Sequence, residues 1–149
     1  MLFRKADSRD LERLIEIRQQ FQRLFHHTDG GDALAESLRA YFLRHMADGG
    51  SVVWLAEEKG RIVSCAFLTC YEDLPSAENP LGRKGYLHNV YTVPAFRGKG
   101  LATQVVKRCI QSARDWDAGS VSLGATQEGA AVYRNLGFEF SDLEMELKL

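Results

Sequence analysis

The chain has 149 residues, of which 45% are hydrophobic and 26% charged, and its formal net charge is -1 at pH 7. This length and composition predict a single globular domain, residues 1–149, and exclude a disordered chain. The near-neutral charge gives no electrostatic reason to expect nucleic acid or an anionic membrane as a partner. No apolar run approaches the length of a membrane span and the N-terminus lacks a signal-peptide core, so a cytoplasmic location is expected.

The first half of the chain has the patterns of one strand, two amphipathic helices and a strand hairpin. Apolar residues recur at helical spacing in 11–25 and again in 34–42. The segment 61–71 is too apolar for a strand with one wet face, which predicts a central strand covered on both sides. The expected elements are strand 2–6, a helix ending near His26, a helix capped by Asp32 and ended by Asp48-Gly49-Gly50, and strands 51–57 and 61–71.

The second half alternates strands and helices after a loop with prolines and glycine at 72–85. The expected elements are strand 86–93, a helix from Leu101 to about Trp116, strand 120–123, a short helix at 128–136, and two closing strands at 138–140 and 143–149. The middle strands predict an antiparallel meander, and the run 86–123 predicts a parallel pair with a right-handed crossover. The fold class is therefore α/β (α+β), with a mixed, mostly antiparallel sheet of about seven strands and helices on both faces.

A glycine-rich turn, Arg97-Gly98-Lys99-Gly100, joins the strand at 86–93 to the following helix. Its glycines permit positive φ and close approach of a ligand, and the free amides of a helix N-terminus favour phosphate. The arginine and lysine add positive charge beside that site. The dinucleotide-binding motif is excluded because Thr103 stands where its third glycine is needed. The Walker motif is excluded because Gly100, and not Ser or Thr, follows the lysine.

What remains is Arg-x-x-Gly-x-Ala at 97–102, and a second motif, Tyr133-Arg134-Asn135-Leu136-Gly137-Phe138, follows it in the chain. These two motifs, and the order of elements over nearly the whole chain, resemble the GNAT superfamily of N-acetyltransferases. The resemblance implies transfer of an acetyl group from acetyl-CoA to a primary amine of a small molecule or protein, by direct attack in a ternary complex and without a metal. It also implies that the cofactor is bound by Val93, Arg97, Gly98, Lys99, Gly100, Leu101, Ala102, Thr103 and Thr126.

The resemblance also implies how the thioester is activated. A main-chain N–H near Val93, at an expected bulge, stabilises the charge that develops on the carbonyl oxygen. Tyr133 then protonates the leaving thiolate as a general acid, because its ordinary pKa of about 10 is near that of an alkyl thiol. Packing of the Tyr133 ring on its helix, with only weak contact to the sulfur, is the alternative.

The general base is harder to assign, because the strand at 86–93 contains no carboxylate. His88 is the candidate, since it titrates near neutrality and the attacking amine must lose a proton. A structural role for His88, bonded to a carbonyl, is an equal alternative, and either His88 or Asn89 is expected to face the acceptor. Thr126 departs from the asparagine that many family members carry there, although its hydroxyl can still contact the cofactor.

Two further interpretations of function stay open. A non-catalytic acetyl-CoA-binding sensor or regulatory module would keep the same glycines, and a nucleotide-binding enzyme is the third. The acceptor is not determined, because carboxylates in 26–33 and 72–85 would attract a cationic amine whereas Arg83 and Lys84 would hold a carboxylate.

The remaining reactive residues predict no further site. The cysteines have no metal-type spacing and are expected to be buried hydrophobes; a catalytic thiol is the less favoured role for Cys65, Cys70 or Cys109. The adjacent histidines at 26–27 lack a third ligand, so no metal is expected. The segment 143–149 alternates apolar and charged residues, which favours strand pairing across a homodimer.

Overall fold

Five strands form one sheet in the order β1-β2-β3-β4-β5 in the computed structural model, which describes residues 1–141 and 143–149. The first four strands are antiparallel to their neighbours, and β5 is parallel to β4. This is the mixed, mostly antiparallel sheet that the sequence predicts. The strands are β1 (Leu2–Lys5), β2 (Ser51–Glu58), β3 (Arg61–Glu72), β4 (Arg83–Thr92) and β5 (Ser120–Leu123).

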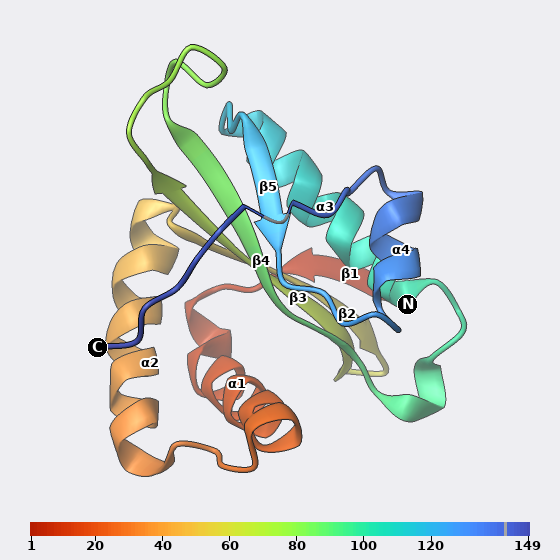
Figure 1. The fold of residues 1–149 in the computed structure, drawn as a ribbon. Helices are drawn as coiled ribbons and strands as arrows, with labels where there is room; N and C mark the ends of the chain where they lie inside the picture. Colours follow the sequence, from red (N-terminus) through yellow and green to blue (C-terminus); the bar gives the residue numbers. More distant parts are fainter. Residues whose placement is uncertain (142) are drawn as a thin grey trace.

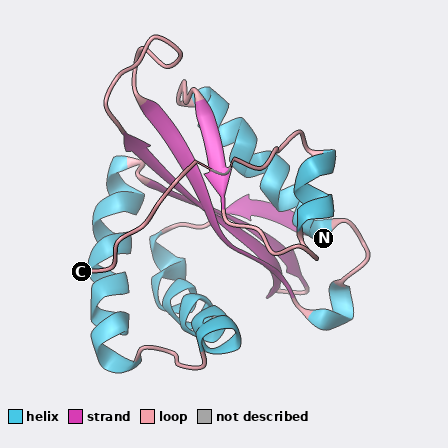
Figure 2. Ribbon diagram, viewed as in Figure 1, coloured by secondary structure: helices cyan, strands magenta, loops and turns pink. Residues whose placement is uncertain are grey.

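Helices cover both faces of this sheet, with α1 and α2 on one side and α3 and α4 on the other (Figures 1 and 2). The α-helices are α1 (Leu11–His26), α2 (Gly31–Asp48), α3 (Leu101–Asp115) and α4 (Ala130–Asn135), with 3-10 turns at Ser8–Asp10 and Pro94–Phe96. The bounds of the helices lie close to those expected. Among the strands, β4 begins three residues earlier than predicted. Among the described residues, no helix combines the length and apolar character needed to cross a membrane.

The central strand β3 contributes to two separate cores. Cys65 and Phe67 pack in the core under α1 and α2, whereas Ala66 and Leu68 pack in the core under α3. All four side chains are buried, with exposed fractions of 6% or less. This alternation confirms the prediction of a strand covered on both faces, and it fixes the register of the sheet because a slip of one residue would exchange the two cores.

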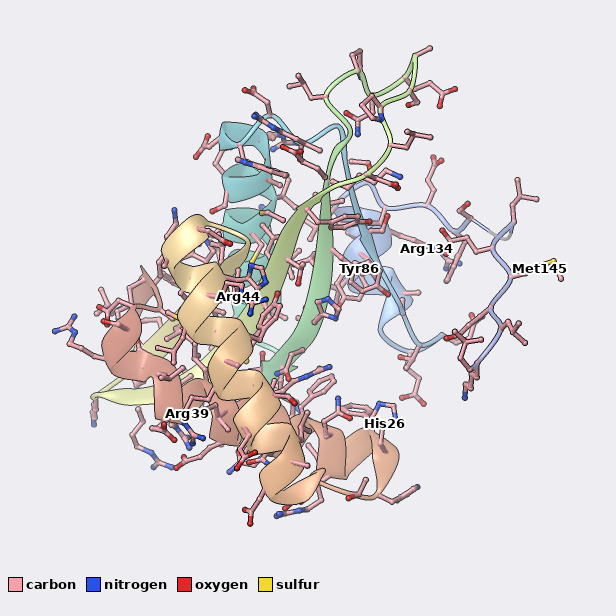
Figure 3. All side chains as sticks on the ribbon, turned by 90° about the vertical axis from the view of Figure 1, so that its left-hand side faces the viewer. His26, Arg39, Arg44, Tyr86, Arg134 and Met145 are labelled. Atoms are coloured by element: carbon pink, nitrogen blue, oxygen red, sulfur yellow. The ribbon has the colours of Figure 1, made fainter. Side chains whose placement is uncertain are left out.

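The sheet has five strands and not about seven, because the described residues after Leu123 contain no strand. The segments at 138–140 and 143–149 were expected to close the sheet, and Asp142 between them lies outside the described residues. The side chains of Leu143, Met145 and Leu147 are 94%, 99% and 83% exposed, and Met145 projects away from the molecule in Figure 3. A strand needs a backbone partner, and this segment pairs with no described strand of its own chain.

Candidate active site

The parallel strands β4 and β5 pair over only part of their length. Their register runs from Lys84 opposite Ser120 to Leu87 opposite Leu123, where β5 ends while β4 continues to Thr92. The edge of β4 that faces β5 is therefore open from residue 88 onward. This opening lies between the two helical layers, so it connects one face of the sheet with the other.

A β-bulge lies in the open part of β4. Tyr91 pairs with Cys65 and His88 pairs with Phe67, so Asn89 and Val90 together oppose a single residue of β3. Asn89 has a φ of 54°, a left-handed conformation that asparagine tolerates better than most residues. The bulge breaks the alternation of side chains along β4. Asn89 therefore does not face away from His88 as the strand pattern implied, and both line the same chamber.

Beyond β4, the glycine-rich turn leaves the start of α3 accessible. Gly98 and Gly100 have φ of 75° and 76°, and a Cβ built on either would meet no heavy atom within 4 Å. Gly100 precedes Leu101, the first residue of α3, and no side chain caps this helix. The first amides of α3 and the positive end of its dipole are thus available to an anion, as the sequence predicts.

The two cations of the turn behave differently. Arg97 donates from Nε to the main-chain oxygen of Thr92 over 3.0 Å, and its guanidinium lies 5.5 Å from the centre of the Tyr91 ring. Lys99 stands over Phe96, with Nζ 4.9 Å from the ring centre. The side chain of Arg97 is therefore held in position by the loop, and it places a positive charge beside the start of α3.

A groove of about 930 Å³ runs from this turn to α4. It contains most of the residues predicted to bind the cofactor, namely Arg97, Gly98, Gly100, Leu101, Ala102, Thr103 and Thr126. Lys99 does not line the groove itself. The hydroxyl of Thr126 accepts a hydrogen bond from the N–H of Gly129 over 3.1 Å, so it helps to begin α4 while facing the groove.

Val93 lies outside the groove, and its amide is not free for the role expected of it. Its N–H donates to the carbonyl of Val63 over 2.9 Å, so it is engaged inside the sheet. Successive main-chain groups of a strand point to opposite edges. The Thr92 carbonyl, which accepts from Arg97, marks the open edge, and the amides of Thr92 and Val90 share that edge. The amides at the open edge beside the bulge are therefore not used by β3, whereas the amide of Val93 is.

A second cavity, here called the acceptor chamber, lies on the α1 side of the opening and has a volume of about 410 Å³. Its walls come from α1, β4, and the residues that follow β5; Figure 3 labels His26 and Tyr86 on two of these walls. The groove and the chamber meet, because five residues line both of them: Phe25, Val90, Thr126, Gly129 and Tyr133.

Tyr133 stands at this junction, on the short helix α4. Its ring packs edge-on against Phe138, with centroids 5.9 Å apart, and Phe138 donates its N–H to the Tyr133 carbonyl over 3.0 Å. Gly137 between them has a φ of 97°, the left-handed conformation that the Leu-Gly-Phe sequence predicts after a helix. Burial raises the pKa of the Tyr133 phenol above its ordinary value of 10.0, which keeps the proton on its oxygen at neutral pH.

His88 lines the acceptor chamber beside Tyr86, whose ring centre is 4.6 Å away. Burial lowers the pKa of His88 below 6.5, and the nearby positive charge of Arg18 lowers it further. The imidazole is therefore neutral at pH 7 and able to accept a proton. Asn89 is 4% exposed, and its Oδ1 is buried without a hydrogen-bond partner among the described residues.

Sequence reasoning missed the contribution of α1. Arg18, Gln22 and Phe25 line the chamber from this helix, and their spacing places them on one helical face. That spacing was the available signal, but only the docking of α1 on β4 shows which face meets the site. Of the two segments whose carboxylates were expected to attract a cationic amine, 72–85 contributes no residue to the chamber and 26–33 contributes only His26.

Two carboxylates of those segments are engaged elsewhere. Asp29 pairs with Arg23 over 2.6 Å, and Asp73 pairs with Lys84 over 2.8 Å. Within the described chain, no group of three or more His, Cys, Asp or Glu side chains is placed to hold a metal ion.

The cysteines have structural positions. Burial raises the pKa of both Cys65 and Cys109 to about 12, and neither lines the groove or the chamber. Cys70 is half-buried, and packs in the core on the opposite side of the sheet from Cys65. A thiol nucleophile is therefore absent from the site as the structure describes it.

Known proteins share this architecture. The profile of the Acetyltransferase (GNAT) family matches residues 11–138. N-acetyltransferase 8 of Rattus norvegicus is 33% identical over 117 residues, 76% of this chain and 47% of that protein. An uncharacterized N-acetyltransferase of Escherichia coli is 30% identical over 96 residues, 62% of this chain and 54% of that protein. The chain thus spans about half the length of these curated relatives.

A solved structure matches over almost the whole chain. It is the crystal structure of a predicted acetyltransferase with acetyl-CoA from Clostridium acetobutylicum, at 32% identity and a TM-score of 0.89. The match covers 99% of this chain and 95% of that one.

Proposed function

Because the chain belongs to the GNAT family of acetyltransferases, we propose that it transfers the acetyl group of acetyl-CoA to a primary amine by direct attack in a ternary complex. The observation that carries this proposal is the junction at Tyr133, where the groove from the glycine-rich turn opens into the acceptor chamber. A donor and an acceptor bound in these two cavities meet within the opening between β4 and β5. The Clostridium relative, whose structure is described with acetyl-CoA, supports acetyl-CoA as the donor.

The glycine-rich turn holds the pyrophosphate of the donor. The first amides of α3 donate to the phosphate oxygens, and Arg97 supplies positive charge from a fixed position. A side chain at Gly98 or Gly100 would occupy space that the phosphates need. The open amides of Val90 and Thr92 stabilise the negative charge that develops on the thioester carbonyl oxygen.

His88 and Tyr133 move the protons. The amine nitrogen forms a bond to the acetyl carbon, and His88 accepts the proton that the nitrogen loses, directly or through one water. The carbon–sulfur bond breaks as Tyr133 gives its proton to the leaving sulfur. His88 then gives up its proton to solvent, and the phenolate of Tyr133 takes up a proton from solvent. Both groups return to their starting states, so the charges balance over one cycle.

The proposal is tested by following thiol release from acetyl-CoA with a panel of amines: amino acids, polyamines, aminoglycosides and lysine peptides. We expect release that depends on one class of acceptor, with one acetylated product per thiol by mass spectrometry. Binding of acetyl-CoA by calorimetry without transfer to any amine would instead support the sensor or regulatory module. A chain that binds no acetyl-CoA would contradict both.

We also propose that residues 143–149 pair with a second copy of this chain. Their exposed apolar side chains alternate with charged ones, as on a strand with one buried face. The sheet ends at β5, and a groove of about 440 Å³ follows β5 against α3, with apolar walls at Ile110, Ala118 and Leu136. A strand added at this edge would cover the groove and the apolar face of the segment together.

A further inference from the structure

Arg18 is a half-buried cation without a described counter-ion. It lies on α1 and lines the acceptor chamber, and no described residue forms a hydrogen bond or ion pair with its guanidinium. Its contact is with Phe21, whose ring centre is 6.0 Å away. Burial lowers the pKa of Arg18, because the surroundings disfavour its charge.

Three other arginines of α1 and α2 are paired with carboxylates. Arg13 contacts Glu16 over 2.8 Å, Arg23 contacts Asp29 over 2.6 Å, and Arg39 contacts Glu12 over 2.8 Å. These pairs are exposed, where each contributes little. Arg44 on α2 also has no described anion, but it is exposed. Arg18 is half-buried and has no anion among the described residues, and burial is where an unpaired charge costs most.

The chamber around Arg18 has no negative side chain. Its lining contains neither Asp nor Glu in the part of the chain that the structure describes. Most of the other walls are apolar or aromatic, including Phe21, Phe25, Tyr86 and Leu123. A polycationic acceptor would bring further positive charge against Arg18 with nothing to balance it, whereas an anionic group would neutralise the guanidinium.

We propose that Arg18 binds the carboxylate of the acceptor, and that the acceptor is an α-amino acid with an apolar side chain. The inference rests on the proposed acetyl transfer and names its substrate class. A planar guanidinium binds a carboxylate through two parallel hydrogen bonds, which fixes the orientation of the bound molecule. The aromatic walls receive the side chain, and the amino group is directed to the junction at Tyr133. A chamber of about 410 Å³ is of a size that suits a molecule of this kind.

The test compares acids with the amines that lack only their carboxylate: leucine with 3-methylbutylamine, and phenylalanine with phenethylamine. Phosphoethanolamine and β-alanine distinguish a phosphate from a carboxylate. We expect thiol release with the amino acids at a kcat/KM at least about 10-fold above that with their decarboxylated partners, as loss of a charge-assisted hydrogen bond implies.

Variants separate recognition from folding. Arg18 also lowers the pKa of His88, so the comparison is made at pH 8, where His88 is neutral with or without Arg18. There, Arg18→Gln should lower kcat/KM for leucine and phenylalanine about 10- to 100-fold, mainly through KM, and should change kcat/KM for phenethylamine far less. Arg18→Lys should recover part of the loss, because it keeps the charge without the planar fork. Arg23→Gln, on the exposed side of the same helix, is the matched control and should leave both substrates unchanged.

The outcomes are distinct. Equal use of acids and decarboxylated amines, preference for phosphoethanolamine, or an equal loss for both substrates in Arg18→Gln would overturn the inference and leave acetyl transfer standing. Absence of thiol release with every amine would overturn the proposed function and this inference with it.

Discussion

Arg97 and Thr92 are joined by a hydrogen bond of 3.0 Å from the guanidinium Nε to the main-chain oxygen, which closes the turn between β4 and α3. The bond holds the last residue of β4 in place, and it also holds the cation beside the first amides of α3. One side chain thus links the strand where the thioester carbonyl would bind to the turn where the phosphates would bind.

Replacing Arg97 by lysine should weaken acetyl-CoA binding although the charge is retained. Lysine has no planar group that can bond Thr92 and stack on Tyr91 while facing phosphate. We expect Kd for CoA to rise about 10-fold by calorimetry, the effect of losing one charge-assisted hydrogen bond. Arg114→Lys, on the far end of α3, is the control. Equal affinity of wild type and Arg97→Lys would show that the loop needs only the charge.

Tyr133→Phe should reduce turnover about 100-fold, which is the low end for loss of a general acid. The ring and its packing on Phe138 are retained, so the unfolding temperature and KM for acetyl-CoA should change little. The decisive measurement is kcat at saturation in both substrates. An unchanged kcat would assign Tyr133 to packing, the alternative that the sequence left open.

His88→Ala should remove a titration from the pH profile of kcat/KM. Burial and Arg18 place the pKa of His88 below 6.5, so the base of the wild type is neutral at pH 7. Protonation of the ring below pH 6.5 adds an acidic limb to the profile, beyond the titration of the amine itself. The variant should be about 100-fold less active at pH 7 and should lack that acidic limb. The acceptor amine titrates in both proteins and cancels in the ratio of the two profiles. Parallel profiles would exclude His88 as the base.

The lowered pKa of His88 also predicts that the folded state becomes less stable as the pH falls. His88 binds a proton more weakly in the folded chain than in the unfolded chain, so the unfolded state takes up more protons below pH 6.5. The free energy of unfolding should therefore fall as the pH drops below 6.5. In His88→Ala this part of the fall should disappear in urea titrations at pH 5 and pH 7.

Local signals made much of the fold and the donor half of the site predictable. The apolar spacing along α1 and α3 depends on one helix and the sheet face that it packs on. The apolar run along β3 likewise depends on one strand and the helices that cover it. The glycine-rich turn could be recognised because its residues are consecutive and their conformations follow from their own chemistry, as the positive φ of Gly98 and Gly100 shows.

The acceptor half depends on contacts between distant elements. The bulge at Asn89 arises where β4 pairs with β3 on one side only, and it rearranged the faces that strict alternation assigned to His88 and Asn89. The amide of Val93 is engaged because the chain still bonds to Val63 there, a contact that depends on the neighbouring strand. Arg18 entered the site through the docking of α1, and nothing in the spacing of its helix distinguished it from the paired Arg13 or Arg23.

Gly100→Ala and Gly60→Ala form a matched pair that separates backbone strain from ligand contact. The two glycines have φ of 76° and 75°, and a Cβ on either would meet nothing within 4 Å. Each substitution should lower the free energy of unfolding by about 1–2 kcal/mol, the cost of a left-handed non-glycine residue. Only Gly100→Ala should raise KM for acetyl-CoA, by about 10-fold or more. A similar KM for the two variants would show that the phosphates do not approach Gly100.

If residues 143–149 pair with a second copy of the chain, one charged substitution on the apolar face of this segment should weaken the dimer. If its apolar face is covered by a second copy, each buried Leu or Met contributes about 1.5–3 kcal/mol to association. Leu147→Glu should therefore raise the dimer dissociation constant at least about 10-fold, measured by light scattering across a dilution series. Glu146→Gln changes the opposite face of the segment and should leave the constant unchanged. A wild-type chain that is monomeric at every concentration, or a Leu147→Glu variant that stays dimeric, would place the partner of this segment elsewhere.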